Sequence, residues 1–356
     1  MEFAIIPYVE KKNLFGLNLS ELESLFVEEG LEKFRAKQVF KWIYTKSART
    51  FSEMTDLSAK LQTDLTNKFN IGSLSLIERQ VSSDGTKKYL FSLNDGNLVE
   101  SVLMCFDDRD SLSACISSQI GCAVKCPFCS TGTLGFRKNL TSDEIIEQIQ
   151  FIQNLEKLRI SNIVFMGQGE PLNNYDSVVK ATRDLGSLIG IGVRHITIST
   201  SGVIPQIEKL AEEGLQITLA LSLHDPDDTD RDYLVPINKK WKINELMQSM
   251  KDYVHRTNRR VTVEYVLLKD LNDSNEKAIK LGRLCADLHC NINLIPYNQS
   301  CSSSEFQRPS NNRIHEFARL VKDHSKGKTV TVRKERGHDI KAACGQLESS
   351  YRLQTH

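Results

Sequence analysis

Residues 121–132 read GCAVKCPFCSTG and place three cysteines, Cys122, Cys126 and Cys129, on one short loop. Three thiolates at this spacing can converge on one inorganic centre, because a single loop can wrap a cluster. Tetrahedral zinc needs four ligands, whereas three thiolates leave one iron of a 4Fe-4S cluster without a protein ligand. We therefore expect a 4Fe-4S cluster whose open iron can hold a substrate. A structural zinc site completed by a distant fourth cysteine is the alternative.

The sequence holds nine cysteines in all. Its first residues show no charged stretch followed by an apolar one, and no run of about 18 apolar residues could span a bilayer. We expect a cytoplasmic protein, in which reducing conditions make a disulfide framework rare. Metal ligation and thiol chemistry then become the leading roles for cysteines that are not packed. Four cysteines outside the recognisable motifs are treated as structural: Cys105, Cys285, Cys290 and Cys301.

Charge is unevenly distributed along a chain of 356 residues whose formal net charge is only +1. Basic side chains outnumber acidic ones in the stretch 31–50, where Phe34, Phe40, Trp42 and Tyr44 are interleaved with them. Basic and aromatic side chains mixed in this way are typical of a face that binds nucleic acid. A solvated amphipathic helix whose aromatic side chains face the core explains the same stretch equally well.

The periodicity of the chain changes near residue 95. Before it, helical patterns at 19–30, 34–46 and 58–69 precede a β-like stretch at 87–104 with a DG turn. We expect an N-terminal helical accessory domain with connecting strands over 1–95, which could contact RNA. A core domain is expected over 96–347, followed by a tail over 348–356.

Within the core, apolar β-rich runs alternate with amphipathic helical stretches. Near-continuous apolar strands separated by helices imply a parallel sheet that is buried on both faces. The chain has no GxGxxG fingerprint, and six βα units follow one another, so we expect an α/β fold, a partial (β/α)6 barrel. The expected strands are 113–120, 162–167, 195–200, 216–223, 261–268 and 291–298.

Chemically unusual side chains recur where these strands end. The loops after the strands of a βα barrel gather at one face, which carries the active site. Each residue alone has an ordinary explanation as a turn, cap or core residue, but their recurrence at strand ends predicts one site. The set comprises the cysteine loop, Gly169, Glu170, Ser199, Ser222, His224 and Asn298.

The cysteine loop resembles the signature of the radical SAM superfamily, whose open cluster iron binds S-adenosylmethionine. Together with the blocks MGQGEPLNNYD, STSGVIP, SLHDPDD, VPINKK, NLIPYN and AACGQL, it resembles the RlmN/Cfr family of ribosomal RNA adenine methyltransferases. The resemblance runs from about residue 14 to residue 347, with the blocks in family order. It implies a radical SAM barrel with a 4Fe-4S cluster and two molecules of S-adenosylmethionine per turnover.

The resemblance also implies residue roles. An electron-poor adenine carbon does not attack a sulfonium methyl group by polar displacement, so the family uses a radical route. Cys344 matches the methyl-carrying cysteine, and Cys115 matches the cysteine that resolves the protein–RNA link by forming a disulfide, which needs a Cα separation of about 4.4–6.8 Å. Glu100 matches the proton acceptor. The implied S-adenosylmethionine contacts are Gly169, Glu170, Ser199, Ser222, Leu223, His224 and Asn298.

Two branches of the family methylate carbon 2 or carbon 8 of adenine. GEPLNN at 169–174 and IPYN at 295–298 are closer to the carbon 2 branch. The resemblance therefore implies methylation of carbon 2 of an adenosine in the peptidyl-transferase centre of 23S rRNA, and of the adenosine 3′ of the anticodon in some tRNAs. A flavodoxin-like electron donor, no membrane and a monomer are expected. The alternatives are carbon 8 methylation, an iron-sulfur redox protein without methyl transfer, and a zinc-stabilised RNA-binding module.

Overall fold

A single sheet of ten strands organises the computed structural model, which describes residues 11–105, 111–299 and 305–347. The strand order is β14-β13-β12-β11-β10-β9-β6-β5-β4-β3. Neighbours from β6 to β14 run parallel, whereas β3, β4, β5 and β6 pair antiparallel. The strands are β3 Ser75–Val81, β4 Lys87–Ser92, β5 Leu98–Cys105, β6 Leu112–Cys115, β9 Asn162–Phe165, β10 Ile196–Thr200, β11 Thr218–Ser222, β12 Val261–Leu267, β13 Cys290–Pro296 and β14 Val330–Val332.

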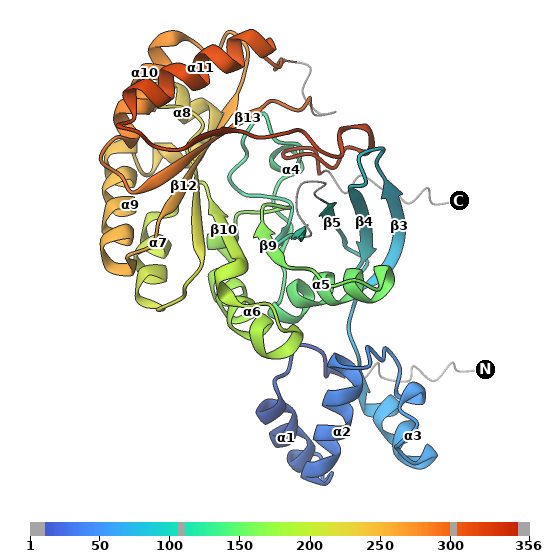
Figure 1. Cartoon of the computed structure of the whole chain (residues 1–356). Helices are drawn as coiled ribbons and strands as arrows, with labels where there is room; N and C mark the ends of the chain where they lie inside the picture. The colour runs from blue at the N-terminus through green and yellow to red at the C-terminus, as the bar shows by residue number, and fades with distance from the viewer. Residues whose placement is uncertain (1–10, 106–110, 300–304, 348–356) are drawn as a thin grey trace, which may run out of the picture.

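The predicted partial barrel is confirmed, because the six expected strands correspond to β6, β9, β10, β11, β12 and β13 in chain order. Helices cover the outer face of these strands (Figure 1). Side-chain caps start several of them, such as Ser274 before α10 and Ser310 before α11. The helices of the core are α5 Ser142–Glu156, α6 Tyr175–Ile189, α7 Ile204–Glu212, α8 Asp228–Leu234, α9 Ile243–Thr257, α10 Asn275–Cys285 and α11 Asn311–His324.

Successive side chains of β12 point alternately into the hydrophobic core and into the barrel interior. Val261, Val263 and Tyr265 are fully buried in the hydrophobic core. Glu264 and Val266 instead line cavities inside the barrel. Successive side chains of a strand point to opposite faces, so the same strand packs helices on one side and presents polar groups on the other.

Three helices form an N-terminal unit beyond one end of the sheet (Figure 1). The three helical patterns of the sequence are confirmed as α1 Leu19–Glu28, α2 Lys33–Tyr44 and α3 Ala59–Lys68, accompanied by η1 Phe51–Glu53 and the pair β1 Lys12–Asn13 and β2 Phe69–Asn70. In the basic stretch, Phe40, Trp42 and Tyr44 are half-buried against the core, as an amphipathic helix requires. Phe34 is 50% exposed beside Arg35, so one basic-aromatic pair faces solvent.

A buried carboxylate attaches this unit to the core. Glu147 on α5 accepts hydrogen bonds from the backbone N–H groups of Ser73 and Leu74 at 2.6 and 3.1 Å. Its Oε1 also lies 2.9 Å from Nη2 of Arg49, and the Glu147 side chain has no exposed surface. The chain leaving the N-terminal unit is therefore bound to the helix that follows the cysteine loop.

We expect Glu147→Ala to lower the free energy of unfolding by about 2–3 kcal/mol, because it leaves buried backbone donors without an acceptor. Urea denaturation followed by circular dichroism measures the change. Glu276→Ala on α10 is the matched control, since that side chain is 79% exposed and its loss should change stability by less than about 0.5 kcal/mol. Equal unfolding midpoints for wild type and Glu147→Ala would contradict the attachment.

The C-terminal segment returns across the sheet after β14, towards the turn between β3 and β4 (Figure 1). Asp84 accepts a hydrogen bond from the backbone N–H of Gly337 at 2.9 Å, and Asp339 accepts one from the hydroxyl of Ser82 at 2.5 Å. The domain boundary predicted between residues 95 and 96 lies inside this antiparallel part of the sheet, between β4 and β5.

Short elements complete the chain. They are β7 Gln119–Ile120, α4 Ser130–Thr133, β8 Lys138–Asn139, η2 Pro171–Asn174, η3 Val193–His195, η4 Pro236–Lys239 and η5 His338–Ile340. Among the helices within the described ranges, none combines the length and apolar character needed to span a bilayer.

Candidate active site

The cysteine loop lies between β7 and α4. Cys122 donates its backbone N–H to Gly135 at 3.1 Å, and Cys129 donates to the carbonyl of Cys126 at 3.2 Å. Gly132 must lack a side chain here, because a Cβ would lie 2.6 Å from the Cys126 carbonyl oxygen. Burial raises the pKa of all three thiols, that of Cys122 to about 12. Binding of a metal centre would displace the protons of these thiols to solvent, because its positive charge stabilises the thiolate form.

The three cysteines fit a cluster better than one zinc ion, because tetrahedral zinc needs four ligands and the loop offers three thiols. A 4Fe-4S cluster held by three thiolates keeps one iron open. Elsewhere among the described residues, carboxylate oxygens of Asp225, Asp227 and Asp230 lie within 4.8 Å of one another.

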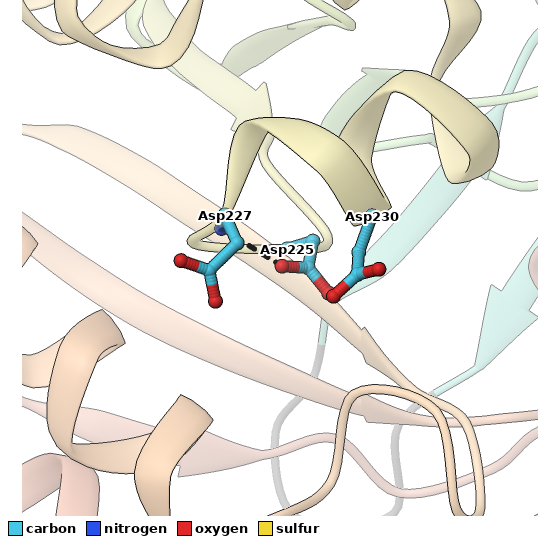
Figure 2. A group of neighbouring side chains, drawn as sticks. All are labelled: Asp225, Asp227 and Asp230. Atoms are coloured by element: carbon cyan, nitrogen blue, oxygen red, sulfur yellow. Dashed lines mark hydrogen bonds between the residues drawn. The ribbon is translucent and has the colours of Figure 1, made fainter.

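The three aspartates are not an open metal site. Figure 2 shows their carboxylates gathered on the turn after β11 and the start of α8. The ammonium of Lys277 already lies among them, 2.6, 3.1 and 2.5 Å from Asp225, Asp227 and Asp230. This ion-pair group instead ties the loop carrying His224 to α10.

A cavity of about 170 Å³, here called the cysteine-side cavity, lies against the loop. It collects six of the seven residues that the sequence assigned to S-adenosylmethionine: Gly169, Glu170, Ser199, Ser222, His224 and Asn298. The seventh, Leu223, is not among the lining residues and is fully buried in the core. Oδ1 of Asn298 is buried without a hydrogen-bond partner in the described structure, so it is free to accept one from a bound ligand. The residues present therefore fit a polar cofactor.

Glu170 is held by the chain itself. Its Oε2 accepts hydrogen bonds from the backbone N–H and the hydroxyl of Ser201, each at 2.7 Å, and its Oε1 accepts one from Leu172. Burial raises the pKa of Glu170. The Gly169–Glu170 turn is thereby locked against the end of β10. Ser201 escaped the sequence analysis, although it stands in the STSG block beside Ser199.

His224 is a neutral side chain in this site. Its Nδ1 accepts a hydrogen bond from the backbone N–H of Val266 at 3.1 Å, which leaves the proton on Nε2. Burial lowers the pKa of His224 to about 3, assisted by the positive charge of Arg231. The ring packs edge-on against Phe128 of the cysteine loop, with centroids 5.2 Å apart. His224 can shape and contact a ligand, but it does not exchange protons near neutral pH.

A second and larger cavity, of about 560 Å³, lies beside the first and is here called the barrel-mouth cavity. Cys344 lines both cavities, and Cys115 lines the larger one. Burial, followed by the charge of Cys344, raises the pKa of Cys115 to about 12. The two cysteines that the resemblance pairs thus lie on one cavity, although they are far apart in the chain.

Contacts with the cysteine loop hold the segment that bears Cys344. The backbone N–H of Ser130 donates to the carbonyl of Gly345 at 2.8 Å, and the hydroxyl of Thr131 donates to the carbonyl of Leu347 at 2.7 Å. Gly345 has φ of +83°, a conformation that side chains with a Cβ rarely adopt. The Cys344 residue remains exposed between these anchored neighbours.

Glu100 lies beside the barrel-mouth cavity and is not among the residues that line it. Val102 and Met104, on the same face of β5, do line it. The carboxylate is buried and lies 3.3 Å from the ammonium of Lys88. The predicted proton acceptor therefore shares a strand face with the cavity and has a cationic neighbour.

The sequence analysis missed several charged residues of the site. Glu264 lines both cavities, and Arg333, 3.6 Å from it, lines the barrel-mouth cavity. Arg231 is fully buried and donates to the carbonyls of Ser201 and Ser222, which line the cysteine-side cavity. No motif in the sequence distinguishes these arginines from exposed ones, because only the fold buries Arg231 and brings the half-buried Arg333 to the cavity.

Comparison with known proteins identifies the two parts of the chain. Residues 116–282 match the model of the radical SAM superfamily, and residues 12–71 match that of a ribosomal RNA large subunit methyltransferase N-terminal domain. A probable dual-specificity RNA methyltransferase RlmN of Thermotoga maritima is 45% identical over 94% of this chain and 97% of its own. The protein of the same name from Acholeplasma laidlawii is 41% identical over 94% of this chain and 98% of its own.

A solved structure agrees with these relatives. The crystal structure of a radical SAM methyltransferase from Sphaerobacter thermophilus superposes with a TM-score of 0.90 at 40% identity. The match covers 95% of this chain and 99% of that one. The likeness therefore extends well beyond the barrel.

Proposed function

The chain belongs to the RlmN family of radical SAM RNA methyltransferases, and from this premise we propose that it methylates carbon 2 of an adenosine in the peptidyl-transferase centre of 23S rRNA. We extend the proposal to the adenosine 3′ of the anticodon in some tRNAs, since the relatives are named as dual-specificity enzymes. The observation that carries it is the position of Cys344, which lines both the cysteine-side and the barrel-mouth cavity. One side chain can thus face the cofactor and the RNA base in turn.

As a radical SAM protein, the chain uses a 4Fe-4S cluster and S-adenosylmethionine. Cys122, Cys126 and Cys129 would hold the cluster, and the polar residues of the cysteine-side cavity would hold S-adenosylmethionine. When bound, these groups supply a methyl group and, after reduction, a 5′-deoxyadenosyl radical. The support is that the three cysteines line the same cavity as Asn298, whose buried side-chain oxygen lacks a partner in the described structure.

The residues of the chain have separate tasks in this proposal. Cys344 would receive the methyl group, and this group would lose one hydrogen atom to the 5′-deoxyadenosyl radical before its carbon bonds to the adenine ring. Glu100 would accept the ring proton, with the ammonium of Lys88 stabilising its carboxylate, while the adduct would lose one electron, which the oxidised cluster could take up. The Cys115 thiolate would then attack the sulfur of Cys344, so that an S–S bond forms and the S–C bond to the base breaks. The freed carbon would keep the electron pair and take up a proton, which completes the methyl group of the released base. His224, which is neutral, and the Gly169–Glu170 turn keep the cofactor oriented.

The partners follow from the reaction class. Radical SAM enzymes need a reductant, and we infer a flavodoxin-like protein as the electron donor. The enzyme is proposed to act as a monomer in the cytoplasm, where ribosomal and transfer RNA are found. The exposed Phe34–Arg35 pair on α2 is a candidate RNA contact. Phosphate contacts there would make RNA binding weaken strongly with added salt.

Mass spectrometry of nucleosides tests the function. Anaerobically reconstituted protein is incubated with S-adenosylmethionine, a reductant and either 23S rRNA fragments or tRNA, and the RNA is digested. We expect 2-methyladenosine. Formation of 8-methyladenosine would assign the chain to the other branch. A loaded cluster that never cleaves S-adenosylmethionine would indicate a redox protein.

We expect Cys115→Ala to stop product release without stopping attachment to RNA. Without the resolving sulfur, the adenine carbon stays linked to Cys344, so released methylated RNA should fall by at least ~100-fold. The linked species should appear as a slowly migrating band on a denaturing gel. Cys290→Ala, at the start of β13 and outside both cavities, should release product as wild type does. Normal release by the Cys115 variant would contradict the assigned role.

A further inference from the structure

Among the residues that the structure describes, Arg231 is the largest side chain that is completely buried. It lies on α8, the helix that follows the loop after β11. Its Nε donates to the carbonyl of Leu223 at 2.9 Å, and its Nη2 donates to the carbonyls of Ser201 at 2.7 Å and Ser222 at 3.2 Å. Its Nη1 donates to the side-chain oxygen of Asn238 at 2.7 Å. A single guanidinium thus joins the ends of β10 and β11.

These acceptors belong to the residues around the cysteine-side cavity. Ser201 also holds the Glu170 carboxylate through its backbone N–H and hydroxyl, and Ser222 lines the cavity itself. The hydroxyls of Ser199 and Ser222 lie 3.2 Å apart across the two strand ends. Removing the guanidinium would free three carbonyls at once and loosen the wall against which S-adenosylmethionine is proposed to bind.

The charge of Arg231 has no carboxylate partner in the described parts of the chain. All four of its hydrogen-bond acceptors are neutral, and no ion pair joins it to Asp or Glu there. The nearby Asp225 is instead paired with Lys277 at 2.6 Å. A buried cation without a counter-ion is costly, so an anion is expected next to it.

The position of the guanidinium indicates which anion this is. Ser201 and Ser222, whose carbonyls accept hydrogen bonds from Arg231, line the cysteine-side cavity together with Cys122, Cys126 and Cys129. A guanidinium stays protonated at neutral pH, so its positive charge lies beside the loop that would hold the cluster. The missing counter-ion therefore corresponds to the ligand set of the cluster.

We propose that Arg231 is a positioning residue that braces the wall of the S-adenosylmethionine cavity and that also serves as the buried counter-ion of the cluster. The inference rests on the proposed function, since it requires that the three cysteines hold a 4Fe-4S cluster. A cluster with three thiolates is anionic, and the electron it accepts makes it more so. A fixed positive charge in a low-dielectric site stabilises the reduced form and raises the reduction potential.

Two substitutions of Arg231 separate the effect of its charge from the effect of its hydrogen bonds to the cavity wall. Arg231→Gln removes the charge and most of the donors, whereas Arg231→Lys keeps the charge and loses the planar fork. Arg259→Gln is the matched control, because Arg259 donates to the carbonyl of Ile217 at the opposite end of the same sheet. The readouts are iron content, midpoint potential from an EPR-monitored titration without S-adenosylmethionine, and the dissociation constant for S-adenosylmethionine.

We expect Arg231→Gln to shift the midpoint potential to more negative values and to weaken S-adenosylmethionine binding at least about tenfold. Arg231→Lys should keep a potential close to that of wild type while also binding S-adenosylmethionine more weakly. The Arg259 variant should match wild type in both measurements. This pattern would separate an electrostatic role from a purely structural one.

A loaded Arg231→Gln protein with an unchanged potential would overturn the counter-ion role, and unchanged S-adenosylmethionine affinity would overturn the brace. If Arg231→Gln takes up no iron, the Arg231→Lys variant is used instead. A midpoint potential of Arg231→Lys equal to that of wild type supports the proposal, and a shift to more negative values refutes it. No RNA enters these measurements. A wild-type protein that binds cluster and cofactor but never methylates RNA would refute the proposed function alone.

Discussion

Cys344→Ala should abolish RNA methylation while leaving reductive cleavage of S-adenosylmethionine measurable. Among the described residues, the thiols of Cys129 and Cys344 line both cavities. Because Cys129 is assigned to the cluster, Cys344 is left to carry a methyl group between the cavities, and its loss removes the carrier. The three cysteines proposed to hold the cluster are separate residues on the loop before α4, so we expect radical formation to be independent of Cys344. We expect methylated RNA to fall by at least ~1,000-fold, below detection by nucleoside mass spectrometry, while 5′-deoxyadenosine is still produced.

The matched control for this result is Cys105→Ala. Cys105 ends β5 and lines neither cavity, so its removal should leave methylation at the wild-type level. Peptide mass spectrometry gives an independent readout, because the wild-type peptide containing Cys344 should carry an added methyl group. Methylation by the Cys344→Ala protein would refute the relay, whatever the state of the cluster.

Cys126→Ala should remove the cluster and every activity that depends on it. Cys126 is the middle one of the three proposed ligands and is half-buried on the loop with Cys122 and Cys129. Two remaining thiolates cannot hold a 4Fe-4S cluster with three ligated irons. We expect the purified variant to lose the broad visible absorption and most of its iron. Its production of 5′-deoxyadenosine should fall to at least ~1,000-fold below wild type.

Cys285→Ala is the control for the loss of a buried thiol. Cys285 ends α10 in the hydrophobic core, away from both cavities, so this variant should keep its iron and its colour. Zinc in place of iron in the wild-type protein would contradict the cluster assignment. A Cys126→Ala protein that still binds stoichiometric iron would contradict the ligand assignment alone.

Much of the barrel could be predicted because its signals are local. Each parallel strand is a short apolar run between amphipathic stretches, and the six runs appear in the sheet in their chain order. The three cysteines lie on one loop, so their spacing in the sequence is enough to predict a cluster site. The boundary near residue 95 was harder to place, since β3 and β4 join the barrel sheet through β5, and strand pairing is not visible in a single sequence.

Some residues of the site could be predicted from the sequence and others could not. Six of the seven residues assigned to S-adenosylmethionine gather on one cavity because strand ends meet at one face of the barrel. Leu223 is oriented into the core instead, since neighbouring residues on a strand end alternate sides. Arg231 and Arg333 could not be recognised, because the burial of Arg231 and the place of Arg333 on the cavity depend on segments packed around them from elsewhere in the chain.

Short-range spacing and periodicity were therefore enough to establish an α/β barrel with an iron-sulfur loop and polar strand ends. Long-range packing decided the rest: it folds the C-terminal segment against α4, brings Cys344 to the junction of two cavities, and places Cys115 on one of them. It also buries Arg231 without a carboxylate partner in the described chain. The physical reason is that covalent spacing controls only groups on one loop or strand, whereas burial, and with it charge and pKa, is set by segments distant in the chain.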